Sequence, residues 1–341
     1  MANLIKIALL IAAGVLLATG VSKFACRQKL QASNETVLAA EHFENWAVKF
    51  GKFYSTPAEK AHRLAVFTKN FNDILVHNAK GLSWTEGLNQ FTDMSVEEFK
   101  AKYTGLKRKE GPTFEADAIN SDIPNPAPSG QVDWIAAGAV TPIKNQGQCG
   151  SCWAFSTTGS LEGLNWIHNK PQTIASFSEQ QLVDCSWLYG NQGCNGGLMQ
   201  DAFKYVIHNG INTEAAYPYV ARDQTCKTKV GVFKITGYKN VPKRSSAGLA
   251  HANLAQPISV SIDAENIMKY TSGIYSNPAC GESLDHGVLL VGYTPQYWHV
   301  KNSWGTTWGE QGYIRFSTTA VADPIGGICG ILLDASYPVI A

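Results

Sequence analysis

The sequence predicts an α+β protein in which a helical half precedes a half rich in β-strands. The first observation is the helical spacing of apolar residues from Cys152 to about Lys170, and again near 178–183 and 198–208. The second is a change, after about Val232, to short β-prone runs at 257–262, 287–293, 298–301 and 312–316. Helices followed by strands are typical of α+β architecture, and we expect a cleft between the halves.

Each predicted helix has local signals of its own. The first has apolar positions at Trp153, Leu161, Leu164 and Ile167. Ser178 is a candidate N-cap for the second helix, and Gly210 ends the third, which runs from about Leu198 to His208. The four strands are short runs between turn residues, as strands of a compact sheet are.

Composition and charge narrow the possible functions. The chain has 341 residues, of which 45% are hydrophobic and 16% charged, enough apolar material for a sizeable core. The formal net charge of +1 gives no electrostatic basis for a nucleic-acid partner. None of the 31 Gly forms a nucleotide-binding loop between a strand and a helix.

The N-terminal segment is typical of a secretory signal peptide at residues 1–22. Ile5 to Leu17 is almost wholly apolar with Lys6 near its start, and small residues follow at 18, 20 and 22. An uncleaved signal anchor is the alternative interpretation. Entry into the secretory pathway implies an oxidising compartment in which most of the eight Cys should pair. The triplet that begins at Asn34 fits an N-glycan acceptor.

The zone after the signal peptide is predicted to be mainly helical and then to become a linker. One helical stripe mixes polar with apolar residues, namely Glu59, Arg63, Phe67, Asn70, Ile74 and Asn78. Buried polar residues need polar partners, so the stripe predicts a helix crossing with a specific network. The segment from Gly87 to Asp93 is predicted to be extended. Four Pro and a basic cluster between Lys107 and Gly130 predict an exposed, protease-sensitive linker.

Cys152 is the candidate nucleophile, because it stands where a Gly/Ser turn meets a predicted helix start. The free N–H groups and positive dipole end there favour a thiolate with a lowered pKa. The alternatives are a structural disulfide and a redox pair with Cys149. Cys26 lies at the precursor end, which leaves seven Cys and therefore one unpaired. A redox motif belongs in a βαβ context, which is absent, and Cys185 and Cys194 are too far apart for a tight zinc knuckle.

A nucleophilic thiolate needs a base, and the base needs an orienting group. His286 directly precedes one predicted strand, and Asn302 directly follows the next. Pairing of these two strands can bring both side chains together. No comparable pattern surrounds the other seven His.

These motifs resemble the papain-like cysteine proteases. The resemblance rests on the segment Gln146–Phe155, on Leu284-Asp285-His286 and on Asn302-Ser303-Trp304-Gly305. The helical stripe, with Gly87, Asn89, Phe91 and Asp93, is similar to the inhibitory prodomain of the cathepsin L-like branch. The resemblance implies a papain-like two-subdomain fold with a helical left half and a β-barrel-like right half, preceded by a mainly helical prodomain. It implies a prodomain and linker at 23–126 and a peptidase domain at 127–341.

The resemblance also implies roles for individual residues. Cys152 is the nucleophile, His286 its base in a thiolate–imidazolium pair, and Asn302 the group that orients the imidazole. Trp304 covers the His–Asn hydrogen bond, and Gln146 donates to the oxyanion. It implies three disulfides, which are Cys149–Cys194, Cys185–Cys226 and Cys280–Cys329.

Substrate binding is likewise implied by the resemblance. Gly196 and Gly197 let a peptide backbone approach closely. The pocket for the second residue before the scissile bond maps to Leu198, Met199, Ser261, Leu284, Gly287 and Asp334. Most of these are apolar, which favours an apolar or aromatic side chain. We hypothesise that Asp334 also admits Arg or Lys; a solvent-facing Asp334 is the alternative.

The function expected from the resemblance is that of a cysteine endopeptidase made as an autoinhibited zymogen. The alternatives are a thiol–disulfide oxidoreductase that uses Cys149 and Cys152, and an inactive binding module. No loop with adjacent His residues, of the kind that makes an exopeptidase, lies between Cys185 and Cys226. The expected partners are protein and peptide substrates, the chain's own prodomain and cystatin-type inhibitors, with no cofactor or metal. We expect a monomer.

Activation is also part of the expectation. The prodomain helices should dock on the β-rich half, and the next segment should run through the cleft backwards. Cleavage between Ser121 and Ser129 should free the enzyme, and protonation of prodomain carboxylates in acid should loosen the docking. This fits a lysosome or vacuole, with secretion to the extracellular space as the alternative.

Overall fold

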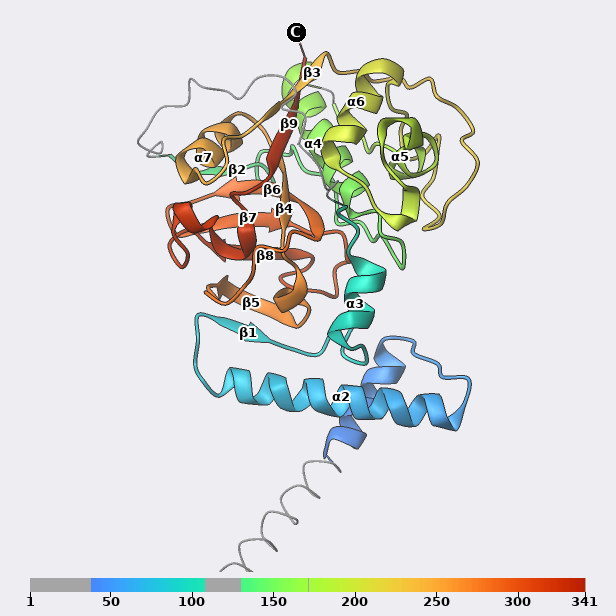
Figure 1. Cartoon of the computed structure of the whole chain (residues 1–341), viewed down its shortest axis with the longest axis vertical. Coiled ribbons are helices and arrows are strands. Elements are labelled where there is room, and N and C mark those ends of the chain that lie inside the picture. The colour runs from blue at the N-terminus through green and yellow to red at the C-terminus, as the bar shows by residue number, and fades with distance from the viewer. Residues whose placement is uncertain (1–37, 108–129, 171, 341) are drawn as a thin grey trace, which may run out of the picture. The chain divides into compact units, whose positions relative to one another are not determined.

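The computed structural model describes residues 38–107, 130–170 and 172–340 (Figure 1). The predicted signal peptide, Cys26, Asn34 and the predicted cleavage region lie outside the described residues. The chain divides into two units, one up to Asp73 and one from Ile74 onward. Within the described ranges, no helix has both the length and the apolar composition needed to cross a membrane.

The first unit is built on a crossing of two helices, as the mixed stripe predicts. A helix at 38–49 meets helix α2 (Pro57–Asn78). Phe67 of the stripe is fully buried, and its ring centroid lies 5.3 Å from that of Phe43 and 5.1 Å from that of Trp46. Burial of these aromatic rings holds the helix pair together.

The second unit begins with the end of α2, strand β1 (Trp84–Glu86) and helix α3 (Val96–Tyr103). Contrary to the prediction, the segment from Gly87 to Asp93 is extended only as far as Asn89. Asn89 Oδ1 accepts the Phe91 N–H at 2.9 Å, which turns the chain back on itself. Ser95 then caps α3 in a capping box.

The helical half contains the three predicted helices. They are α4 (Cys152–Asn169), α5 (Glu179–Cys185) and α6 (Met199–Asn209). Ser178 accepts the Gln181 N–H and so caps α5, and Gly210 ends α6 with φ of 77°. Two 3₁₀ turns, η1 (Trp187–Tyr189) and η2 (Gly193–Asn195), complete this half.

The β-rich half is one mixed sheet that also includes β1. The strand order is β1-β5-β8-β7-β6-β4-β9-β3, and β2 (Val132–Asp133) pairs with β6. The predicted strands are present as β4 (Ile258–Ile262), β6 (His286–Tyr293), β7 (Tyr297–Lys301) and β8 (Tyr313–Ser317). Because the pairing path ends at β1 and β3, the sheet is open, not a closed barrel.

Besides β1 and β2, four elements of this half were not among the predicted ones. They are β3 (Gly237–Asn240), α7 (Ser246–Ala255), β5 (Tyr270–Tyr275) and β9 (Ala335–Val339). Strand β5 contains Gly273 at φ of 94°, and β9 contains Pro338, both of which weaken a strand signal. The 3₁₀ turns η3 (Glu265–Ile267), η4 (Asp323–Ile325) and η5 (Ile328–Gly330) connect the strands.

Small residues on α4 allow it to pack directly on strand β6 (Figure 1). A Cβ on Gly159 would lie 2.7 Å from Leu289 Cδ2, so a larger residue there would force the Leu289 side chain to shift. Ser156 Oγ donates to the Val288 carbonyl at 2.7 Å. The helix that begins at Cys152 is thereby held against the strand that begins at His286.

Candidate active site

Cys152 is the free thiol at the start of α4. Among the described cysteines it alone lies outside a disulfide, and it is buried. The bridges are those that the resemblance implies, namely Cys149–Cys194, Cys185–Cys226 and Cys280–Cys329. Because Cys149 is bonded to Cys194, it does not form a redox pair with Cys152.

His286 and Asn302 meet through the pairing of β6 and β7. Leu289 lies opposite Lys301 in this antiparallel pair. His286 and Asn302 therefore stand at the same end of the strand pair. His286 Nε2 lies 2.8 Å from Asn302 Oδ1, and Oδ1 also accepts the Ser303 N–H at 2.8 Å. An amide oxygen only accepts, so Nε2 carries the proton and Nδ1 is left as the basic nitrogen. Nδ1 is buried and has no hydrogen-bond partner among the described residues.

Trp304 shields this hydrogen bond. Its ring stacks on the imidazole of His286, with centroids 4.5 Å apart and planes 25° apart. Both side chains are buried. The stack keeps water away from the bond between His286 and Asn302, which is the position the resemblance implies for Trp304.

The backbone segments that carry Cys152 and His286 approach each other where Gly287 meets Trp153. A Cβ on Gly287 would lie 3.3 Å from Trp153 Cα and 3.4 Å from Trp153 N. These two residues directly follow His286 and Cys152. The absence of a side chain at Gly287 lets the two backbones approach closely.

Burial governs the charge of both groups in this precursor. It raises the pKa of the Cys152 thiol to about 12, although the Gly287 N–H favours the thiolate. It lowers the pKa of His286 to about 4, against the effect of the Asn302 hydrogen bond. Burial thus acts against the lowered thiol pKa and the thiolate–imidazolium pair expected from the sequence, because desolvation disfavours the charged form of each group.

Gln146 is held next to Cys152 by hydrogen bonds at both ends of its amide. Its Oε1 accepts from Ser303 Oγ at 2.6 Å. Its Nε2 donates to the carbonyls of Cys149 at 3.0 Å and Tyr103 at 3.2 Å. The side chain is fully buried, and its orientation is fixed.

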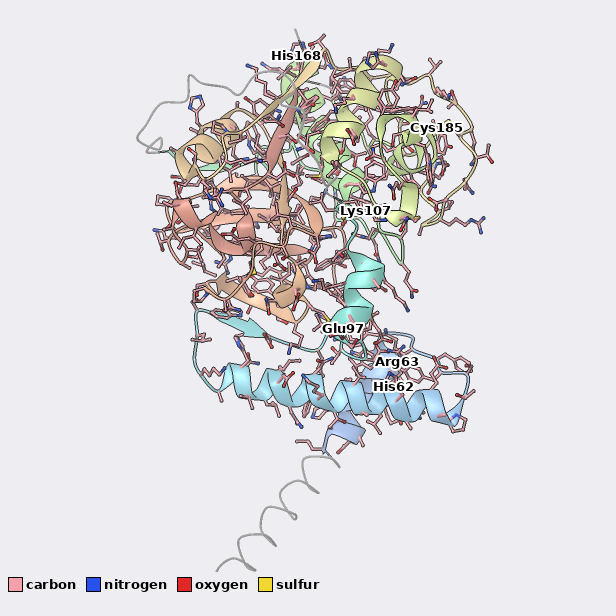
Figure 2. The ribbon with its side chains drawn as sticks, viewed as in Figure 1. His62, Arg63, Glu97, Lys107, His168 and Cys185 are labelled. Atoms are coloured by element: carbon pink, nitrogen blue, oxygen red, sulfur yellow. A yellow bond between two sulfur atoms is a disulfide. The ribbon has the colours of Figure 1, made fainter. Side chains whose placement is uncertain are left out.

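Residues 105–107 pair with backbone on both sides of the site. The N–H groups of Gly105 and Leu106 donate to the Asp285 carbonyl at 3.0 and 2.9 Å. Gly197 donates to the Gly105 carbonyl at 2.9 Å, and Lys107 donates to the Gly197 carbonyl at 3.2 Å. The bridge between Leu106 and Gly197 is parallel. Lys107 Nζ reaches the helical half and donates to Gln192 Oε1 at 3.2 Å (Figure 2).

Glycine is required where this segment passes the site. A Cβ on Gly105 would lie 2.1 Å from the Gly150 carbonyl oxygen, and a Cβ on Gly196 would lie 2.7 Å from the Gly105 carbonyl oxygen. Gly197 has no room either, because a Cβ there would lie 2.8 Å from the Trp153 ring. Gly196 and Gly197 thus present bare backbone, as the resemblance implies.

The residues mapped to the pocket form a continuous group. A Cβ on Gly287 would lie 3.0 Å from Met199 Sδ, and Gly287 lies opposite Ser261 in the pairing of β6 and β4. Ser261 Oγ donates to Asp334 Oδ2 at 2.6 Å, and Gln200 Nε2 donates to Asp334 Oδ1 at 2.8 Å. Leu284 belongs to the same buried apolar cluster as Met199, and Leu198 packs against that cluster. Asp334 is half-buried, and its carboxylate contacts Ser261 and Gln200.

Several residues at the site were not found from the sequence. Ser303 orients Gln146, Gln200 contacts Asp334, and Tyr103 and Gly105 lie over the site. Of these residues, only Ser303 could have been identified from the sequence, because it directly follows Asn302. Within the described ranges, no three His, Cys, Asp or Glu side chains are grouped so as to hold a metal ion.

Comparison with known families defines the class of protein. The family described as papain family cysteine protease matches residues 128–339, and the cathepsin propeptide inhibitor domain (I29) matches residues 43–99. The chain therefore belongs to the papain family, and it is a cysteine endopeptidase made as a zymogen with its own inhibitory prodomain. Nothing in these comparisons supports an oxidoreductase.

Individual relatives place it in the cathepsin L-like branch. The chain is 44% identical over 317 residues to a cathepsin L-like proteinase of Fasciola hepatica, with 88% of this chain and 93% of the relative covered. It is 43% identical over 318 residues to digestive cysteine proteinase 2 of Homarus americanus, covering 89% and 95%.

Solved precursors share the fold. Recombinant stem bromelain precursor is 39% identical with a TM-score of 0.78, covering 89% of this chain and 99% of that one. Digestive procathepsin L 3 of the Tenebrio molitor larval midgut is 38% identical with a TM-score of 0.75, covering 89% and 99%. These likenesses confirm the predicted papain-like α+β fold preceded by a prodomain.

Proposed function

We propose that Cys152 is the nucleophile of the peptidase, His286 its base, Asn302 the orienting group and Gln146 an oxyanion donor. The observation that carries this proposal is a free thiol at a helix start, beside an imidazole whose Nε2 is bound to Asn302 and whose Nδ1 is free. Nucleophile, base and orienting group in this order are the parts that covalent hydrolysis needs.

The chemistry follows from these positions. The Cys152 proton passes to His286 Nδ1, and the thiolate attacks the scissile carbonyl carbon. The oxyanion accepts from Gln146 Nε2 and from the Cys152 N–H. The imidazolium then gives its proton to the leaving amine, and an acyl-enzyme remains. Water, deprotonated by the same imidazole, releases the acid and restores the thiol.

Removal of the prodomain is the step that activates the pair. Gly105 contacts the loop before Cys152, and Tyr103 occupies the Gln146 amide. When these residues leave, water returns to the site, the thiol pKa falls and the imidazole pKa rises. The thiolate–imidazolium pair then becomes accessible. We place the signal peptide at 1–22, the prodomain and linker at 23–126 and the peptidase domain at 127–341.

Gly197 is the proposed main-chain contact for substrate, and Asp334 the proposed determinant of specificity. The parallel pairing of Leu106 with Gly197 means that a substrate bound antiparallel there runs in the opposite direction to the prodomain. Ser261 and Gln200 are neutral donors, so they leave the charge of the Asp334 carboxylate unbalanced. The pocket therefore accepts apolar side chains along its walls and Arg or Lys at Asp334.

The proposed setting is the secretory pathway, in a lysosome or vacuole, with the extracellular space as the alternative. Three disulfides suit an oxidising compartment, and the apolar run at 5–17 suits a signal peptide. The enzyme acts as a monomer, and cystatin-type proteins are proposed as further inhibitors.

The test uses the full precursor, activated in acid, with a fluorogenic peptide substrate. Cys152→Ala and His286→Ala should abolish turnover, and Asn302→Ala should lower it about 10²-fold. His251→Ala, an exposed His on α7, is the control and should be active. Iodoacetamide should label one Cys, Cys152, in the active enzyme. Retained turnover in Cys152→Ala, or two labelled Cys after mild reduction without unfolding, would refute the proposal.

A further inference from the structure

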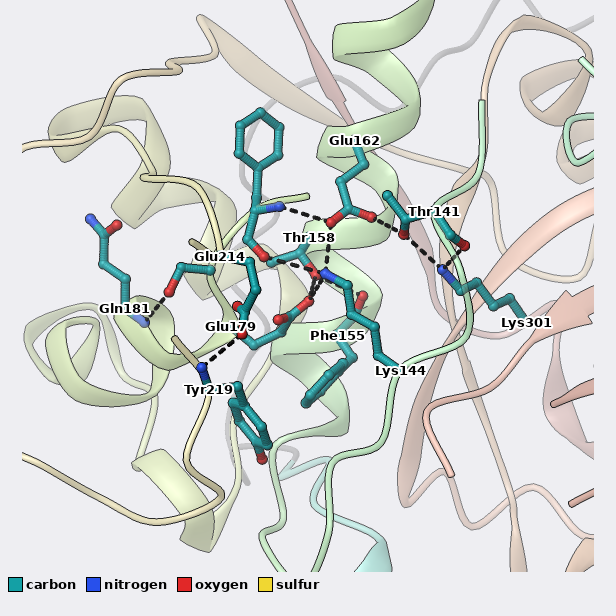
Figure 3. A network of polar contacts seen from close by, with 12 residues as sticks. Thr141, Lys144, Phe155, Thr158, Glu162, Glu179, Gln181, Glu214, Tyr219 and Lys301 are labelled. Atoms are coloured by element: carbon teal, nitrogen blue, oxygen red, sulfur yellow. Dashed lines mark hydrogen bonds and ion pairs between the residues drawn. The ribbon is translucent and has the colours of Figure 1, made fainter. Parts of the chain in front are cut away.

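A buried chain of polar contacts joins the two halves of the enzyme (Figure 3). Lys301 ends β7, directly before Asn302, and its Nζ donates to Thr141 Oγ1 at 2.9 Å and to the Thr141 carbonyl at 2.7 Å. Thr141 Oγ1 in turn donates to Glu162 Oε2 at 2.6 Å. Glu162 lies on α4, the helix that begins at Cys152. One hydroxyl therefore connects the strand of the orienting group with the helix of the nucleophile.

The far end of this chain is anchored in the helical half. Lys144 Nζ donates to Glu162 Oε1 at 2.8 Å and to Glu179 Oε1 at 2.6 Å. The Phe177 N–H also donates to Glu162 Oε1 at 2.9 Å. Glu162 is 1% exposed and Lys301 is 7% exposed, so water does not screen these contacts. The cluster thus brings together two lysines, Lys144 and Lys301, and two glutamates, Glu162 and Glu179.

The short segment 141–146 forms the seam between the halves. Gln146 N–H donates to the Ser303 carbonyl at 2.8 Å, and Gly305 N–H donates to the Lys144 carbonyl at 3.0 Å. The segment thus pairs with the residues that follow Asn302 while its side chains reach α4. Asn302, Lys301 and Glu162 also line one small pocket.

We propose that Thr141 is a positioning residue for the peptidase reaction, whose hydroxyl couples Lys301 to Glu162 and so sets Asn302 and His286 relative to Cys152. A hydroxyl accepts one hydrogen bond and donates another at the same time, which a methyl group of equal size does not do. This inference rests on the roles proposed above for Cys152, His286 and Asn302.

Loss of the hydroxyl should loosen the alignment without dismantling the fold. Lys301 would keep the Thr141 carbonyl, and Glu162 would keep Lys144 and the Phe177 N–H. The direct side-chain link between β7 and α4 would be gone. Small displacements of reacting groups reduce the rate of chemistry far more than they reduce substrate binding.

The experiment compares Thr141→Val with Thr141→Ser in the full precursor, activated by an added protease that is then removed. In Thr141→Val we expect kcat to fall about tenfold while KM stays within about twofold. Alkylation of Cys152 by iodoacetamide should slow by a similar factor. Thr141→Ser, which keeps the hydroxyl, should restore both rates to near those of the parent enzyme.

Tyr217→Phe is the matched control, because it also removes one buried hydroxyl. Tyr217 Oη donates to Asp184 Oδ2 at 2.7 Å entirely within the helical half. Its melting temperature should fall as that of Thr141→Val does, with kcat unchanged. If Tyr217→Phe lowers kcat as much, general loss of stability explains the effect and the inference is overturned.

Two further outcomes would also overturn it, namely a parental kcat in Thr141→Val and an equal loss in Thr141→Ser. If Thr141→Val does not fold, Lys301→Met removes the other side of the same contact and should show the same loss of kcat; a parental kcat there overturns the inference. Cys152→Ala separates the two proposals. Turnover in Cys152→Ala would refute the proposed function. If Cys152→Ala is inactive but Thr141→Val has the kcat of the parent enzyme, only the positioning role is refuted.

Discussion

The side-chain amide of Gln146 donates to the main-chain carbonyl of Tyr103 at 3.2 Å. Trp304 Nε1 donates to the same carbonyl at 3.2 Å. A carbonyl of the prodomain thus occupies the donor that we assign to the oxyanion. We infer that inhibition in this precursor combines steric blockage with occupation of this proposed oxyanion donor.

Replacement of Gln146 should affect turnover and inhibition together. In activated Gln146→Ala, kcat should fall about 10²- to 10³-fold, because one oxyanion donor is lost. Gln148→Ala is the control, since Gln148 lies in the same loop and its side chain bonds to the Tyr103 side chain. Steady-state kinetics on a fluorogenic peptide measure the kcat of both variants. A parental kcat in Gln146→Ala would remove this residue from the mechanism.

Gly105→Ala should open the precursor. The added Cβ would lie 2.1 Å from the Gly150 carbonyl oxygen, so residues 105–107 must shift away from Cys152. We expect iodoacetamide to alkylate Cys152 of the intact precursor at pH 7 at least tenfold faster than in the parent, because water regains access to the thiol. Gly130→Ala is the control, as the nearest atom to its Cβ would be 3.5 Å away. Equal alkylation rates in Gly105→Ala and the parent would contradict the prediction.

Acid should act on the closed precursor in opposite senses through His286 and Asp285. Burial lowers the pKa of His286 from 6.5 to about 4 in the closed state, so opening takes up a proton between pH 6.5 and 4 and is favoured by acid. Asp285 acts in the opposite sense, because burial raises its pKa from 3.8 to about 6 despite Lys100. Opening therefore releases a proton from Asp285 between about pH 6 and 3.8, and acid favours the closed form there.

Hydrogen exchange of the amides at 105–107 measures this balance. In the Cys152→Ala precursor, which cannot cleave itself, the two effects largely offset each other, so exchange corrected for intrinsic rates should change little between pH 6 and 4. In Cys152→Ala/His286→Ala only the Asp285 effect remains, so exchange should decrease over that range. The same decrease in both proteins would rule out His286 as the group that opposes Asp285.

Asp334→Ala should change specificity at the second residue before the cleavage site. For a substrate with Arg there, kcat/KM should fall about tenfold, the effect of losing roughly 1.4 kcal/mol of charge pairing. A substrate with Leu at that position should be cleaved at a similar rate by both enzymes. Glu282→Ala, which removes an exposed carboxylate from the same half, is the control. An unchanged ratio of Arg to Leu cleavage would show that Asp334 does not contact the substrate side chain.

Much of the site could be predicted from local patterns. The odd number of Cys pointed to one free thiol, and Cys152 does begin a helix. His286 and Asn302 meet because they flank two strands that follow one another and pair. Such neighbours in sequence become neighbours in space with little help from the rest of the chain.

Other features depend on segments far apart in the sequence. Gly105 contacts Gly150, Tyr103 meets Gln146, and Thr141 joins Lys301 to Glu162. Strands β5 and β9 form despite Gly273 and Pro338, because pairing with neighbours outweighs weak local preference.

The sequence by itself determined the order of helical and β-rich parts, the start of α4 at Cys152 and the partnership of His286 with Asn302. These follow from periodicity and from pairing between adjacent strands. The tertiary structure alone decided how strongly burial acts on the site. Burial raises the pKa of Cys152 and lowers that of His286 because distant segments exclude water from both, and desolvation depends on packing in three dimensions, not on the residues beside each group.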